Sequence, residues 1–268
     1  MDKGDGMFVF AVDMDGTLLN NDNEYNRVLF NRINNEYKGM FKFLVASSNT
    51  TNHLQSFFEN DDIYFIGSNG AVIMYKGDIL HTSYITENDV RVAIKYLERN
   101  SITSYVMSTL DTSFASTSAS DVFIERMHGY YSDLNVSAKL NIQLVTKITI
   151  EMNDTEKDYT KNIIKDLNQA LDNSIVVDSG FNCFDIINQN TNKSVAIHKV
   201  LDILGENVES LYTFGDSDND IEMLQMTEHS YAMENANVRV KKIAKHICHS
   251  NENDGVLKTI ETVLKKEL

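Results

Sequence analysis

Two aspartates, Asp13 and Asp15, stand two positions apart in the stretch AVDMDGTLLN, which covers positions 11–20. The apolar run 7–12 comes directly before them and is typical of a strand that is buried on both faces. Two like charges held close together raise each other's pKa and lower the stability of the fold. A divalent cation would offset that repulsion, and its charge would also polarise a phosphoryl group.

Polar residues also follow other predicted strands. Ser47 comes after the apolar run 41–46, Asp216 comes after the run 211–214 and its glycine, and Lys193 opens a later helical stretch. In an open parallel sheet, ligands bind beyond the carboxyl ends of the strands. Oxygen-rich sites without His or Cys select hard cations. The residues therefore favour a site for Mg²⁺ and a phosphate.

The order of predicted elements would bring these strand ends together. Strand patterns at 7–12, 41–46 and 63–66 alternate with helical stretches, and the same rhythm returns from residue 194 onward. Alternating strands and helices predict a parallel sheet with right-handed crossovers.

The middle of the chain has a different pattern. Residues 147–152 alternate polar and apolar side chains, which is the period of a sheet with one face in water. We therefore predict an α/β fold with a doubly wound parallel-sheet core domain and an inserted α+β cap domain. The predicted core comprises residues 1–81 and 191–268, and the predicted cap comprises residues 82–190.

Composition narrows the class of protein. The chain has 268 residues, of which 42% are hydrophobic and 24% are charged, as in ordinary globular proteins. A formal net charge of −15 argues against nucleic-acid and anionic-membrane partners. Residues 1–6 are polar, no apolar stretch is long enough to span a bilayer, and Cys183 and Cys248 suggest no disulfide framework. We expect a cytoplasmic protein, a monomer or weak homo-oligomer, that binds a small-molecule phosphate ester.

Four motifs resemble those of the haloacid dehalogenase-like superfamily. They are DMDGT at 13–17, Ser47 after its strand, Lys193, and GDSDND at 215–220. The stretches SNGA, AMENAN and NDGV are similar to those of its Cof-type subfamily, which carries a large α/β cap. DMDGTLLN together with VASSN and SGFNCFDII is similar to the bacterial sugar phosphatases of that subfamily. The resemblance covers nearly the whole chain, and its first and last motifs are the specific ones.

The resemblance implies a role for each carboxylate. Asp13 would be the nucleophile that forms an aspartyl-phosphate. Asp15 would be the general acid that protonates the leaving alcohol and then the base that activates water. Mg²⁺ would be held by the Asp13 carboxylate, the Asp15 backbone carbonyl and Asp216.

Further residues would surround this pair. Ser47 and Lys193 would bind the transferring phosphoryl oxygens. The other implied residues are Gly16 and Thr17, which would shape the turn after the nucleophile, and Asn219 and Asp220, which would support the metal and orient Lys193, with Asn219 near the phosphate.

The substrate prediction depends on Asn49. The Cof-type pattern usually has Gly-Arg where this chain has Ser48 and Asn49. An Arg would suit a second anionic group, whereas an Asn suits sugar hydroxyls, so we expect sugar monophosphates. Alternatively, Asn49 only caps a helix that starts near Thr50. Ser48 is undecided between capping and phosphate binding, and in the cap we expect Phe181 and Asn182 to face the substrate.

Three activities fit these residues. The first is a Mg²⁺-dependent phosphatase acting on small phosphorylated metabolites, which is the prediction we favour. The second is a phosphosugar mutase with the same aspartyl-phosphate chemistry. The third is a non-enzymatic phosphoaspartate switch, which would need neither Asp15 nor a large insertion over the pocket.

Overall fold

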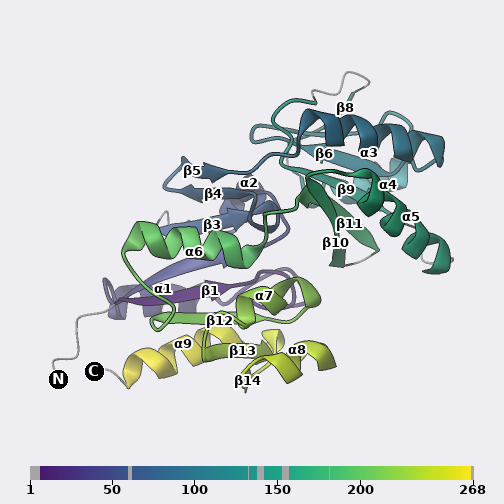
Figure 1. Cartoon of the computed structure of the whole chain (residues 1–268). Coiled ribbons are helices and arrows are strands. Elements are labelled where there is room, and N and C mark those ends of the chain that lie inside the picture. The colour runs from purple at the N-terminus through teal and green to yellow at the C-terminus, as the bar shows by residue number, and fades with distance from the viewer. Residues whose placement is uncertain are drawn as a thin grey trace.

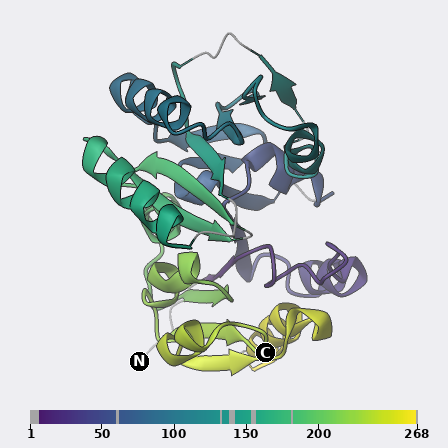
Figure 2. The same cartoon turned by 90° about the vertical axis from the view of Figure 1, so that its right-hand side faces the viewer.

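A computed structural model describes residues 7–59, 62–131, 133–137, 142–152, 157–180 and 182–266. Within those ranges the strands form one eight-stranded and one six-stranded sheet. The sheets belong to two domains that lie one above the other in both views (Figure 1, Figure 2). We call the domain with the larger sheet the core and the other the cap.

The core sheet is largely parallel. Its strands, in spatial order, are β14 (His246–Cys248), β13 (His229–Met233), β12 (Leu211–Gly215), β1 (Phe8–Val12), β2 (Phe41–Ala46), β3 (Ile63–Gly67), β4 (Val72–Tyr75) and β5 (Asp78–Thr82). The six strands from β14 to β3 are parallel, and β4 and β5 add an antiparallel edge. The parallel order places the carboxyl ends of β1, β2 and β12 side by side.

Helices cover both faces of this sheet. The core helices are α1 (Arg27–Glu36), α2 (Thr51–Ser56), α6 (Lys193–Leu204), α7 (Ile221–Leu224), α8 (Val238–Ile243) and α9 (Gly255–Lys265). Alternate residues of β1 face opposite sides, so Phe10 packs in one apolar cluster with α1 and α9, whereas Val9 packs in another with α6. This arrangement explains the continuous apolar sequence of β1, and the predicted doubly wound α/β class is confirmed.

The cap has a mostly antiparallel sheet. Its strands, in spatial order, are β10 (Ser174–Gly180), β11 (Cys183–Asn188), β9 (Lys147–Glu151), β6 (Tyr105–Ser108), β7 (Ser113–Ala115) and β8 (Leu134–Val136). Its helices are α3 (Glu87–Arg99), α4 (Asp121–Met127) and α5 (Lys157–Ala170). Ile148 and Ile150 of β9 pack against α3 and α5 in one apolar cluster.

The polar face of β9 is not in water, which corrects the prediction made from its alternating sequence. Lys147 is 3% exposed and Thr149 is 5% exposed. The Lys147 ammonium reaches the backbone of Ser48 in the core. A period of two identifies a polar face, but it does not distinguish water from another domain as the neighbour of that face.

Two chain segments connect the domains and lie side by side. The Asn188 side-chain amide donates a hydrogen bond to the Tyr84 carbonyl at 3.0 Å, and the Thr191 hydroxyl donates one to Ser83 Oγ at 2.8 Å. The chain changes sheet between β5 and α3 and again between β11 and α6. We keep the division into residues 1–81 with 191–268 and residues 82–190 as a proposal.

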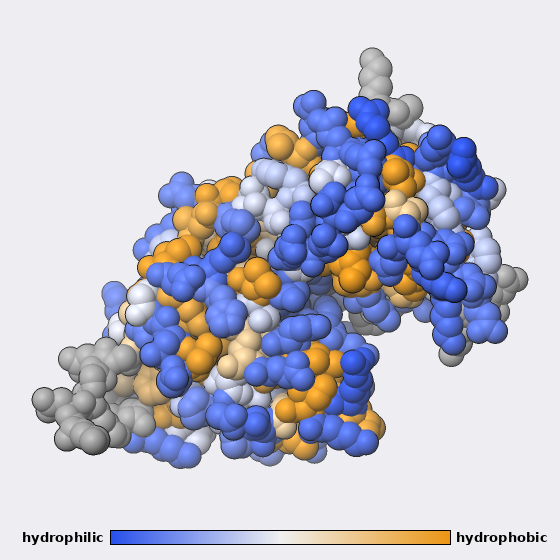
Figure 3. All heavy atoms as spheres, viewed as in Figure 1, coloured by the Kyte–Doolittle hydropathy of each residue, from blue (hydrophilic) through white to orange (hydrophobic). Residues whose placement is uncertain are grey.

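The surface and helices are those of a globular fold. On the face shown in Figure 3, hydrophilic residues spread over both domains with apolar residues among them, and the surface is indented between the domains. Within the part of the chain that the structure describes, none of the helices combines the length and the apolar character that crossing a membrane would need.

Candidate active site

A cavity of about 590 Å³ lies between the two domains. From the core it is lined by Asp13, Asp15, Gly16, Ser48, Asn49, Asp216, Ser217 and Asn219. From the cap it is lined by Arg126, Met127, Tyr130, Tyr131, Lys147, Thr149, Ser179, Gly180, Asn182, Cys183 and Asp185. The cavity therefore meets the carboxyl ends of β1, β2 and β12, where the sequence predicted a site.

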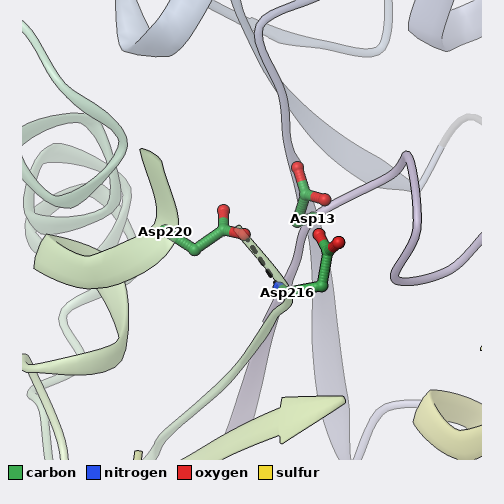
Figure 4. Close-up of side chains that lie close together, drawn as sticks. All are labelled: Asp13, Asp216 and Asp220. Atoms are coloured by element: carbon green, nitrogen blue, oxygen red, sulfur yellow. Dashed lines mark hydrogen bonds between the residues drawn. The ribbon is translucent and has the colours of Figure 1, made fainter. Parts of the chain in front are cut away.

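Three carboxylates cluster at the end of the core sheet. Asp13 follows β1 and Asp216 follows β12, and the parallel pairing of these strands brings the two residues together. One oxygen from each of Asp13, Asp216 and Asp220 lies within 4.8 Å of the others. Figure 4 shows the Asp13 and Asp216 carboxylates close together, with Asp220 beside the Asp216 backbone.

Burial and repulsion make these carboxylates hard to ionise. Burial raises the pKa of Asp13 well above its usual range, the Asp220 carboxylate raises it further, and Lys193 opposes both. Burial and the Asp220 carboxylate raise the pKa of Asp216 to about 6. Burial also raises the pKa of Asp15, although His53 and Lys193 oppose it. A divalent cation would relieve this repulsion, so the donor set fits Mg²⁺.

Lys193 is held between two of these carboxylates. Its Nζ lies 2.6 Å from Asp13 Oδ1 and 2.6 Å from Asp220 Oδ1. It is the first residue of α6, whose N-cap is Asn192. Burial alone would lower the pKa of Lys193, but Asp13 and Asp220 raise it above its usual value. The side chain is therefore a fixed ammonium beside Asp13.

Asp220 has little coordinating capacity left for a metal. Its Oδ2 accepts hydrogen bonds from the backbone N–H groups of Asp216 at 3.0 Å and Ser217 at 3.1 Å, while its Oδ1 holds Lys193. Asp13 and Asp216 are thus the better carboxylate ligands in the cluster. Asn219 lines the cavity, and its Oδ1 accepts from the Ser217 hydroxyl at 2.7 Å.

Gly16 shapes the turn after Asp13. Its φ is +75°, and a β-carbon there would lie 2.6 Å from Asp216 Oδ2, so a larger residue would be strained and would also clash. The Thr17 hydroxyl donates a hydrogen bond to Asp216 Oδ1 at 3.3 Å. These contacts agree with the turn-shaping role expected for Gly16 and Thr17.

Two asparagines that the sequence reasoning did not single out support this turn. The Asn235 side-chain amide donates to the Gly16 carbonyl at 2.7 Å and accepts from the backbone N–H of Asn251 at 3.1 Å. Asn251 in turn donates to the Leu19 carbonyl at 2.9 Å. The sequence motifs could have identified both residues, because Asn235 lies in the AMENAN motif and Asn251 lies just before NDGV.

Asn49 contacts Asp15 and does not cap a helix. The N-cap of α2 is Thr50, whose side chain accepts from the His53 backbone, so the capping interpretation of Asn49 is wrong. The Asn49 side-chain amide instead donates to Asp15 Oδ2 at 2.9 Å. Ser47 is buried and its Oγ accepts from the Asn49 backbone N–H at 3.1 Å, whereas Ser48 and Asn49 line the cavity.

The two cap residues proposed from the SGFN stretch have different outcomes. Phe181 lies outside the described residues. Asn182 has a left-handed backbone with φ of 60° and lines the cavity. Its carbonyl accepts from the Met152 backbone at 2.9 Å, which holds this loop against β9.

Lys147 is a cap residue that the sequence reasoning did not assign to the site. Its Nζ donates to the Ser48 carbonyl at 2.8 Å and lies 3.4 Å from Asp185 Oδ2. Burial alone would lower its pKa, but the Asp185 carboxylate and the Tyr131 phenol raise it above the usual value. The only sequence signal was its polar position in the alternating pattern of β9.

Asp185 gathers donors from both domains. It accepts from the Thr149 hydroxyl at 2.6 Å and from the Asn69 side-chain amide at 2.8 Å. Because the Thr149 hydrogen points to Asp185, the Tyr131 hydroxyl donates to Thr149 Oγ1 across 2.8 Å. Asn69 follows β3 and has a left-handed backbone with φ of 55°. The cap thus contacts the core at two loops that follow neighbouring strands.

The raised pKa values predict that Asp216→Asn stabilises the metal-free protein. A raised folded-state pKa means that stability is highest below the unfolded pKa near 4 and is lost as pH rises through the folded value, about 6 for Asp216. In EDTA at about pH 7.5, the variant is expected to be more stable than the wild type by about 1–3 kcal/mol. Urea unfolding measures this difference.

The pH dependence is the control. Between about pH 7.5 and pH 5.5 the wild type should gain stability relative to Asp216→Asn, because only the wild type protonates this carboxylate. A variant that is less stable than the wild type in EDTA at the higher pH would contradict the repulsive cluster.

Comparisons with known proteins show what the whole chain is similar to. The sequence profile of the haloacid dehalogenase-like hydrolases matches residues 10–260. The 5-amino-6-(5-phospho-D-ribitylamino)uracil phosphatase YbjI of Escherichia coli K12 is 28% identical, over 97% of each chain. The crystal structure of SMU.1108c from Streptococcus mutans UA159 has a TM-score of 0.88 and 28% identity, over 97% of this chain and 100% of that one. The subclass IIB sugar phosphatase BT4131 shares the fold, with a TM-score of 0.79 and 17% identity over 96% of this chain and 98% of that one.

Proposed function

Because this chain belongs to the haloacid dehalogenase-like hydrolases, as its motifs indicated, we propose that it is a Mg²⁺-dependent phosphatase acting through an aspartyl-phosphate. It is an enzyme of the phosphoric monoester hydrolase class. One observation carries the proposed chemistry: Asp13 borders the cavity with Lys193 at 2.6 Å and Asp216 beside it. A nucleophilic carboxylate thus lies next to a fixed ammonium and a second carboxylate suited to a metal.

The Asp13 and Asp216 carboxylates, with the Asp15 backbone carbonyl, would hold Mg²⁺. When bound, the ion would supply the positive charge that keeps the carboxylates ionised and polarises the phosphoryl group. Lys193 would neutralise the charge on the transferring oxygens. Ser47 and Asn219 remain proposed phosphate-binding residues, and Ser48 joins them because it lines the cavity.

Asp13 and Asp15 would divide the reaction into two steps. An Asp13 oxygen attacks phosphorus and the ester bond breaks, while the Asp15 carboxyl gives its proton to the departing oxygen. The raised pKa of Asp15 favours this protonated form, and the Asn49 amide fixes its Oδ2. The Asp15 carboxylate then takes a proton from water, which attacks phosphorus and frees Asp13.

We propose sugar monophosphates and related phosphorylated polyols as substrates. Ser48 and Asn182 offer hydrogen-bonding groups to hydroxyls, and Tyr130 offers an aromatic ring to a planar group. The name of the Escherichia coli relative describes a phosphorylated ribityl chain on a uracil ring, which combines both features. We also propose that the enzyme is cytoplasmic and is a monomer or weak homo-oligomer.

Both remaining alternatives also involve a phosphorylated Asp13. A phosphosugar mutase would return the phosphoryl group to a second hydroxyl of the sugar instead of water. Relatives named as phosphatases favour hydrolysis for this chain. The non-enzymatic switch is disfavoured because Asp15 lines the cavity opposite a large cap.

Phosphate release from a panel of phosphorylated metabolites tests the proposal. EDTA is expected to abolish release, since Asp13 and Asp216 repel each other without a cation, and Mg²⁺ should restore it. With a hexose 1-phosphate, free phosphate should accumulate without an isomerised sugar phosphate. Full-rate hydrolysis in chelator would refute the metal site, and isomerisation without release would establish the mutase.

A further inference from the structure

The cap places two cations on the cavity, and each is paired with a carboxylate. Lys147 lies 3.4 Å from Asp185 Oδ2, with its side chain 4% exposed and that of Asp185 fully buried. Arg126 forms a hydrogen-bonded ion pair with Glu151, with side chains 45% and 18% exposed. Both cations line the cavity. The two pairs together carry no net charge.

The Lys147 ammonium already has two partners in the protein. It donates a hydrogen bond to the Ser48 carbonyl at 2.8 Å and forms an ion pair with Asp185 Oδ2 at 3.4 Å. A phosphate or carboxylate on the leaving group would therefore have to compete with the buried Asp185 carboxylate for the charge of Lys147.

The charge balance differs between the two ends of the cavity. At the Asp13 end, Lys193 and the proposed Mg²⁺ would meet the phosphoryl group. At the cap end, an anionic leaving group would lose its hydration without gaining a free cation, which is unfavourable in a desolvated site. A neutral leaving group with hydroxyls would lose much less.

We propose that Glu151 and Asp185 are specificity-determining residues, which exclude a second anionic group from the leaving portion of the substrate. They do so by neutralising Arg126 and Lys147. This inference rests on the proposed phosphatase function and refines its substrate class to monophosphates of uncharged polyols. Glu151 acts by neutralising Arg126. Asp185 acts by neutralising Lys147, and it also lines the cavity itself.

The test compares two substrates that differ by one phosphate. For fructose 6-phosphate and fructose 1,6-bisphosphate, kcat/KM is measured in the wild type, Glu151→Gln and Asp185→Asn. Glu151→Gln is expected to raise the bisphosphate-to-monophosphate ratio about 10-fold. The change leaves Arg126 without its carboxylate partner, so its charge can attract the second phosphate, and an attraction between partly exposed opposite charges is of this order. Asp185→Asn is expected to raise it at least as much, because Lys147 is buried.

A double variant is the matched control. Arg126→Gln with Glu151→Gln frees no cation, so its ratio should return to that of the wild type. Thermal unfolding checks that each variant is folded. Should Asp185→Asn fail to fold, Glu151→Gln decides the outcome alone, since its pair is only partly buried.

Two failures are distinguishable. Hydrolysis of p-nitrophenyl phosphate, measured in parallel, reports the phosphatase chemistry without a sugar leaving group. If folded, active Glu151→Gln keeps a ratio within about twofold of the wild type, the specificity role is overturned while the phosphatase stands. If the wild type hydrolyses no phosphate ester in Mg²⁺, the proposed function and this inference fall together.

Discussion

Asp13→Asn is expected to lose at least about 10⁴-fold in turnover of every phosphate ester, including aryl phosphates. The side chain keeps its shape, but a neutral amide has no nucleophilic oxygen to form the aspartyl-phosphate. Lys193 retains Asp220 as its partner at 2.6 Å, so the fold around it should remain. Steady-state phosphate release and intact-mass spectrometry after acid quench measure the two effects, and the phosphorylated species should be absent.

Asp202→Asn is a matched control for this variant. Asp202 is exposed on α6, the helix that begins with Lys193, and the same chemical change there should leave turnover and labelling at wild-type levels. If Asp13→Asn turns over at a rate near the wild type, the nucleophile is another residue. Asp15 would then be the first to examine.

Asp15→Asn is expected to slow turnover in a way that depends on the leaving group. For a sugar phosphate, loss of the proton donor should lower the rate about 10²- to 10⁴-fold. For p-nitrophenyl phosphate, the departing phenolate needs less protonation, so the first step should suffer less. Water attack still lacks its base, so Asp13 should accumulate as the phosphorylated form. A burst of p-nitrophenol equal to the enzyme concentration would measure this.

Asn49→Ala tests how much the Asp15 carboxyl group depends on its hydrogen bond from the Asn49 amide. This variant keeps Asp15 but removes the amide that donates to its Oδ2 at 2.9 Å, so a smaller loss, about 10-fold, is expected without a burst. Equal losses for sugar and aryl phosphates in Asp15→Asn, with no burst, would contradict its acid–base role. The two variants together distinguish proton transfer from side-chain positioning.

Much of the core site could be predicted because each of its strands can be recognised from a short stretch of sequence. An apolar run followed at once by a polar residue identifies a buried strand and its carboxyl end. Parallel pairing then brings such ends together, so Asp13 and Asp216 could be predicted as neighbours although they lie far apart in the chain. Lys193 was predictable for the same reason, as the first residue of a helix beside that edge.

The contacts between domains could not be read in this way. Lys147 and Ser48 are 99 residues apart, and their contact depends on how one domain sits on the other. The alternating sequence of β9 would be the same whether its polar face met water or packed on a polar partner. The contact of Asn49 with Asp15 likewise depends on side-chain directions in two loops, which no periodic pattern encodes.

The two segments that connect the domains form a two-stranded link, since Asn188 is hydrogen-bonded to Tyr84 and Thr191 is hydrogen-bonded to Ser83. A two-stranded link of this kind would bend more easily than it would twist, because torsion would pull one segment along the other and break these lateral bonds. We therefore expect any movement of the cap to be hinge-like. Lys147 contacts the Ser48 carbonyl at 2.8 Å, and a hinge-like movement would return it to this same partner.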